Sequence, residues 1–65
     1  MKKRENNLIT VVILSANEDD VISRAISSGL LLTNNITVID SFSTDDTVKI
    51  AKRMRAKVIF HKLKD

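Results

Sequence analysis

Apolar and polar positions along the chain alternate in blocks that predict three strands and two helices. Residues 8–14 are a nearly unbroken apolar, β-branched run, which is the pattern of a strand covered on both faces. Residues 36–39 and 57–60 form two shorter apolar runs and predict two further strands. The stretches between the strands place apolar residues at helical spacing: Val21, Ile22, Ala25, Ile26, Gly29 and Leu30 in the first, and Thr47, Ile50, Ala51 and Met54 in the second.

Polar residues mark the predicted ends of the helices. Acidic residues at 18–20 and 45–46 are expected in the two first helical turns, where the helix dipole favours negative charge. Ser43 or Thr44 is expected to cap the second helix, and Gly29 to help end the first. The same acidic residues are adjacent in sequence and would point different ways on a helix, so they predict dipole complementarity rather than a metal pair.

The order strand, helix, strand, helix, strand predicts an α/β fold. We expect a three-stranded parallel sheet of order 3-2-1 with two crossover helices, formed by residues 8–65 and preceded by a loose polar tail at residues 1–7. This is half of a doubly wound sheet, and it leaves the first strand with an unpaired edge. The edge at residues 8–14 is therefore expected to pair with a second copy of the chain or with a missing C-terminal half.

Composition excludes several classes of protein. The 65 residues contain no cysteine and one histidine, which excludes a disulfide framework and a Cys/His zinc site and fits a reducing, cytoplasmic compartment. No apolar run approaches the ~20 residues of a transmembrane helix. The net charge is +3 and the last third is basic, but the chain has no Tyr or Trp for base stacking, so nucleic acid is not an expected partner. A single glycine excludes a dinucleotide fingerprint and a P-loop.

Polar side chains follow the first two predicted strands. Ser15, Asn17 and Glu18 come after the first, and Asp40 and Ser41 after the second. In a parallel sheet these strand ends are neighbours, and their oxygens would line one side of a crevice suited to donors on a base or a ribose. The alternative is local: Asn17 satisfies turn backbone, Glu18 favours a helix start, and Asp40 caps the next turn. The spacing leaves both interpretations open.

Two motifs carry a resemblance to family 2 glycosyltransferases. Residues 9–18 resemble the family's opening strand and Asn-Glu turn, and residues 38–47 resemble its second-strand signature, a valine-aspartate pair followed by a Ser-Thr-Asp-x-Thr helix start. The likeness covers about residues 8–60 and is closest to the branch associated with lipopolysaccharide or cell-surface glycan assembly. It implies a nucleotide-diphospho-sugar transferase fold, a nucleotide-diphospho-sugar donor, a divalent metal (Mg²⁺ or Mn²⁺) and inverting transfer to a hydroxyl. It also implies nucleotide-binding positions at Ser15, Asn17, Glu18, Asp40 and Ser41.

The chain departs from the family's pattern in ways that bear on function. Many members have Pro at the position of Leu14 and an aromatic residue at that of Ala16, and the common Asp-Asp-Gly form becomes Asp40, Ser41 and Phe42 here. Phe42 either covers a ligand or packs on the adjacent helix.

The family's metal-binding Asp-x-Asp lies beyond the third strand, its catalytic base lies further on, and these 65 residues contain neither. We therefore expect a partial glycosyltransferase domain that binds a nucleotide sugar, holds no metal or other cofactor, has no catalytic residue and is inactive alone. The alternative is a small non-enzymatic α/β module that self-associates or binds a partner through its open edge strand.

Overall fold

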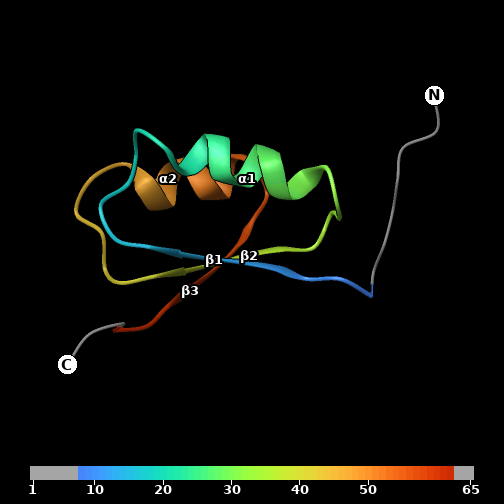
Figure 1. Cartoon of the computed structure of the whole chain (residues 1–65). Helices are drawn as coiled ribbons and strands as arrows, with labels where there is room; N and C mark the ends of the chain where they lie inside the picture. The colour runs from blue at the N-terminus through green and yellow to red at the C-terminus, as the bar shows by residue number, and fades with distance from the viewer. Residues whose placement is uncertain (1–7, 63–65) are drawn as a thin grey trace.

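The computed structural model describes residues 8–62, which form three strands and two helices in the expected order (Figure 1). The tail predicted at residues 1–7 lies outside the described residues. The three strands form one parallel sheet of order β1-β2-β3, which confirms the predicted α/β class and strand order. The elements are β1 (Val11–Ser15), α1 (Ile22–Leu30), β2 (Ile36–Asp40), α2 (Thr47–Arg53) and β3 (Lys57–Phe60).

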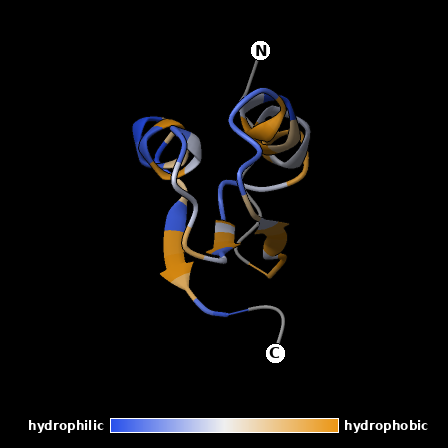
Figure 2. Cartoon of the chain, turned by 90° about the vertical axis from the view of Figure 1, so that its left-hand side faces the viewer, coloured by the Kyte–Doolittle hydropathy of each residue, from blue (hydrophilic) through white to orange (hydrophobic). Residues whose placement is uncertain are grey.

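Both helices lie on the same face of the sheet, as the end-on view in Figure 2 shows. The hydrophobic core fills the layer between them. Its side chains come from one face of each strand and from the inward stripe of each helix. The residues at helical spacing in the sequence are therefore the ones that pack against the sheet. The buried members are Ile22, Ile26, Ile36, Val38, Ala51 and Ala56, with Val11, Ile13, Ile50, Met54 and Val58 packed against them.

The opposite face of the sheet is exposed, and we call it the open face. Its exposed apolar side chains include Val12, Leu14 and Ile59, which are 53%, 60% and 41% exposed. The sequence pattern predicted a first strand covered on both faces, whereas within residues 8–62 helices cover only one. The reason is topological, since both crossovers carry their helices to the same side.

The first strand is shorter than the apolar run that predicted it. Pairing with β2 begins at Val11, whose backbone N–H donates to the Asn35 carbonyl at 2.9 Å. The carbonyl of Ile9 instead accepts a hydrogen bond from the buried Thr33 hydroxyl at 2.9 Å. The start of the run is therefore tied to the turn after α1 and not to the sheet. Among the described residues, neither helix has the length and apolar character needed to cross a membrane.

Gly29 is a packing residue of α1 and not its terminator. The helix continues through it to Leu30, and its backbone φ is not positive. A Cβ at this position would lie 2.9 Å from the Ile36 Cδ1 atom and 3.1 Å from the Val11 Cγ1 atom. The missing side chain lets the end of α1 approach β1 and β2 closely.

We predict that Gly29→Ala lowers the free energy of unfolding by about 1 kcal/mol. Alanine gains about 1 kcal/mol of helix propensity, but overpacking against two side chains costs typically 1–3 kcal/mol. Ser28→Ala is the matched control, because Ser28 is exposed on the same helix turn and gains propensity without a clash. Urea unfolding of both variants tests this, and a Gly29→Ala protein more stable than Ser28→Ala would contradict the packing role.

Candidate functional site

The carboxyl ends of β1 and β2 lie side by side, as the parallel arrangement predicted. Ser15 and Asp40 are paired in register, and the Ser15 hydroxyl donates to Asp40 Oδ1 at 2.7 Å. Beyond the strands, the Ser41 backbone N–H donates to the Ser15 carbonyl at 2.9 Å. The structure thus brings the two groups of predicted site residues to one edge of the sheet.

Asp40 is fully buried, and its carboxylate is satisfied by three donors. Besides Ser15, the Ser43 hydroxyl donates to Oδ1 at 2.6 Å and the Ser43 backbone N–H donates to Oδ2 at 2.7 Å. Burial raises the pKa of Asp40, but the hydrogen bonds from Ser43 and Ser15 outweigh it, and the pKa lies below its ordinary value. Asp40 is therefore an ionised group that organises its neighbours, which is the local role the sequence left open.

Asn17 serves the backbone of the neighbouring loop. Its Oδ1 atom accepts hydrogen bonds from the N–H groups of Thr44 at 2.8 Å and Asp45 at 3.4 Å, and its own N–H donates to the Ser43 hydroxyl at 2.8 Å. Its φ of 52° lies in the left-handed region, which asparagine tolerates better than most residues. The side chain and the backbone conformation of Asn17 both fit this position.

The loops at residues 16–21 and 41–46, which we call the paired loops, exchange further hydrogen bonds at the left-hand end of Figure 1. The Asp19 N–H donates to Asp45 Oδ2 at 3.2 Å, and the Asp46 N–H donates to Asp19 Oδ2 at 3.4 Å. The Glu18 N–H donates to Thr47 Oγ1 at 2.8 Å. Burial raises the pKa of Asp45, but hydrogen bonds from Thr47 and from backbone N–H groups lower it below the ordinary value. Each loop therefore satisfies backbone groups of the other.

This exchange moves the helix starts relative to the sequence prediction. The helices begin at Ile22 and Thr47, after the acidic residues that were expected in their first turns. Ser43 and Thr44, the predicted caps, contact Asp40 and Asn17 instead. The first N–H of α2, that of Thr47, donates to Asp45 Oδ1 at 2.9 Å. Hydrogen bonds across the paired loops are the reason for the difference.

The residues at this edge do not fit a metal ion. Within residues 8–62 no group of three or more His, Cys, Asp or Glu side chains is placed to hold one. The carboxylates of Asp19 and Asp45 already accept hydrogen bonds from backbone N–H groups. The first residue of each acidic pair, Asp19 or Asp45, therefore serves backbone hydrogen bonding here.

Phe42 packs on the third strand. Its ring stacks on Phe60 with 5.8 Å between ring centroids and 23° between ring planes. Phe42 has a φ of 51°, a conformation that costs a bulky residue roughly 1–2 kcal/mol. The residue thus occupies a backbone position that suits glycine, and the stacking offsets the strain.

The predicted site residues fall into two layers. Ser15 and Asp40 are buried, whereas Asn17 is exposed and Glu18 and Ser41 are half-buried. Sequence reasoning missed two residues that build the edge, Ser43 and the buried Thr47. Both belong to the Ser-Thr-Asp-x-Thr segment, whose hydroxyl groups were the available signal.

Comparison with known proteins relates the chain to glycosyltransferases. It is 42% identical over 59 residues to an uncharacterized glycosyltransferase of Rickettsia conorii, a match that covers 91% of this chain and 21% of the relative. It is 49% identical over 51 residues to an uncharacterized glycosyltransferase of Rickettsia typhi, covering 78% of this chain and 18% of the relative.

The chain therefore spans about a fifth of the length of these curated relatives. No protein-family model and no solved structure matches it. The chain is thus similar to a segment of these glycosyltransferases.

We predict that Asp40→Asn lowers the free energy of unfolding by about 2 kcal/mol at pH 7, because a buried charge-assisted hydrogen-bond group is lost. The folded-state pKa of Asp40 lies below the unfolded value of about 3.9, so its contribution is present above that pH and is lost as the pH falls through the folded-state pKa. Urea unfolding between pH 7 and pH 2.5 measures both effects. Between pH 7 and pH 2.5, Asp40→Asn should lose less stability than the natural chain. The exposed-residue variant Asp20→Asn should lose as much as the natural chain. Equal losses in all three proteins would contradict the stabilising role of the Asp40 carboxylate.

We also predict a coupled effect of Phe42 and Phe60. Phe42→Gly relieves about 1 kcal/mol of left-handed strain but loses a stacked pair worth roughly 0.5–1.5 kcal/mol, so it should change stability little. In a Phe60→Ala background no stack remains to be lost, and Phe42→Gly should then stabilise the fold by about 1 kcal/mol. A double-mutant cycle by urea unfolding measures this, and additive effects would show that the rings do not interact.

Proposed function

We propose that the chain is the nucleotide-binding segment of a family 2 glycosyltransferase with a nucleotide-diphospho-sugar transferase fold, of the branch that assembles cell-surface glycans. The observation that carries the proposal is the in-register pairing of Ser15 with Asp40, which puts both resembling motifs at one edge of the sheet. The similarity to rickettsial glycosyltransferases supports the same class. The alternative, a non-enzymatic module, has no comparable support.

The groups available to a nucleotide are those of the outer layer. The Asn17 Oδ1 atom accepts a hydrogen bond from the Thr44 N–H, which leaves the amide nitrogen as the group proposed to donate to a base carbonyl. The Glu18 carboxylate suits ribose hydroxyls, and Ser41 offers one further polar group. Ser15 and Asp40 lie beneath them and act as positioning residues, holding the loops that carry the contacts.

The charge at this edge favours the nucleoside part of the donor over its diphosphate. Five acidic residues lie in the paired loops: Glu18, Asp19, Asp20, Asp45 and Asp46. A diphosphate placed among them is repelled unless a cation intervenes. Binding of the diphosphate and the metal, and deprotonation of the acceptor, therefore fall to the remainder of a longer transferase, and we expect this chain alone to transfer no sugar.

We predict that uridine, cytidine, guanosine or thymidine, titrated into the ¹⁵N-labelled chain, shifts the amide signals of Asn17, Glu18 and Ser41. The nucleoside with the largest shifts identifies the base, and its diphosphate should bind no more tightly without a divalent cation. Shifts confined to the opposite end of the sheet, or none at any of these amides, would contradict the proposal.

A matched pair of variants assigns the contact. Glu18→Gln removes the acceptor charge proposed for the ribose and should weaken nucleoside binding about tenfold, as expected for one charged hydrogen bond. Asp20→Asn makes the same charge change on an exposed residue of the same loop and should leave binding unchanged. Equal losses in the two variants would indicate a general charge effect.

A further inference from the structure

Acidic residues gather at one end of the molecule. Every acidic residue within residues 8–62 lies in the paired loops or at the adjoining strand tip. The opposite end is formed by the turn after α1 and the turn after α2, and we call it the basal end. Its exposed cations are Lys52, Arg53, Arg55 and Lys57.

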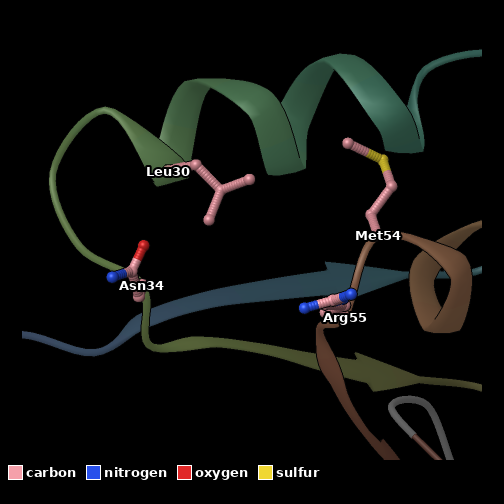
Figure 3. Close-up of a pocket in the computed structure, with 4 residues that line it drawn as sticks. All are labelled: Leu30, Asn34, Met54 and Arg55. Atoms are coloured by element: carbon pink, nitrogen blue, oxygen red, sulfur yellow. The ribbon is translucent and has the colours of Figure 1, made fainter. Parts of the chain in front are cut away.

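The basal end also carries exposed leucines. Leu30, Leu31 and Leu32 are consecutive and are 40%, 77% and 52% exposed. A cavity of about 330 Å³ lies between the two turns, and Figure 3 shows the side chains that border it: Leu30, Asn34, Met54 and Arg55. Apolar side chains and a guanidinium group thus meet at one hollow, contributed by segments that are distant in sequence.

This combination of side chains distinguishes among possible partners. A nucleic acid would use the cations but gains little from leucines, and the basal end offers no aromatic ring for base stacking. A second copy meeting the same surface across a two-fold axis would set four cations against four. A bilayer surface with anionic lipids uses both kinds of group, because phosphates attract the cations while leucines enter the boundary between headgroups and acyl chains.

We propose that the basal end docks on a membrane surface rich in anionic lipids. Leu31 and Leu32 insert at headgroup depth, and Arg55 binds a lipid phosphate beside the cavity. The paired loops then face away from the bilayer, and their acidic residues are kept from the anionic surface. The docking does not depend on nucleotide binding, because the two surfaces lie at opposite ends of the strands.

Co-sedimentation of the full chain with vesicles tests the proposal. Large unilamellar vesicles of phosphatidylcholine with 30% phosphatidylglycerol are expected to bind it at low salt, and pure phosphatidylcholine vesicles are not. The exposed-residue variant Leu31→Ser/Leu32→Ser should weaken binding at least about tenfold. Arg53→Gln/Arg55→Gln should weaken it roughly 25-fold, since each cation near an anionic surface contributes about fivefold. Circular dichroism confirms that each variant is folded.

Two control variants test whether binding depends on the basal end or only on the total charge and apolar surface of the chain. Arg24→Gln/Lys49→Gln removes the same charge from exposed helix positions outside the basal end, and Val12→Ser/Leu14→Ser removes apolar surface from the open face. Both should bind vesicles like the natural chain.

Any one of four binding results would overturn the proposal, and so would one result on the oligomeric state. The binding results are equal binding to both vesicle types, equal weakening by the basal and control variants, no effect of the leucine changes, or competition by RNA that does not depend on the leucines. A shift from dimer to monomer on changing the leucines, without vesicle binding, would instead assign the surface to self-association and overturn it too.

Discussion

A single buried carboxylate holds the carboxyl edge of the sheet together. Asp40 ends the central strand, and its side chain accepts hydrogen bonds from Ser15 on one side and Ser43 on the other, while its carbonyl accepts one from the His61 N–H at 3.0 Å. Burying a carboxylate without donors is strongly unfavourable, so the fold must bring these groups to it. The carboxylate thereby links β1, β2 and the loop that follows β2, while the Asp40 carbonyl provides the link to the end of β3.

The arrangement of the paired loops follows from that contact. Ser43, held by Asp40, offers its hydroxyl oxygen to the Asn17 N–H, and Asn17 in turn accepts from Thr44. The conformation of each loop depends on the other loop, because each supplies hydrogen-bond partners to the other. An edge built in this way is preorganised, so a ligand that binds there spends little of its binding free energy on ordering the loops.

Local patterns in the sequence predicted what local forces decide. Apolar periodicity located both helices and all three strands, and the third strand was predicted at its observed bounds. Ser43 and Thr44 were misassigned as caps because their partners, above all Asn17, lie more than twenty residues away. Phe42 likewise finds its partner in Phe60 on another strand. Pairings of this kind depend on the folded topology, which propensity and spacing do not encode. The site residues predicted after β1 and after β2 do lie together in the structure, because parallel pairing of the two strands is enough to place them at one edge.

The open face has a thermal consequence. Globular domains typically gain about 12–15 cal/mol/K of heat capacity per residue on unfolding, chiefly from newly hydrated apolar surface. Val12, Leu14 and Ile59 are already about half hydrated in the folded chain, so they add less to that change than buried side chains do. The residues described here should therefore unfold with a smaller heat-capacity increment than their number suggests. A smaller increment flattens the curve of stability against temperature, so cooling weakens the chain less.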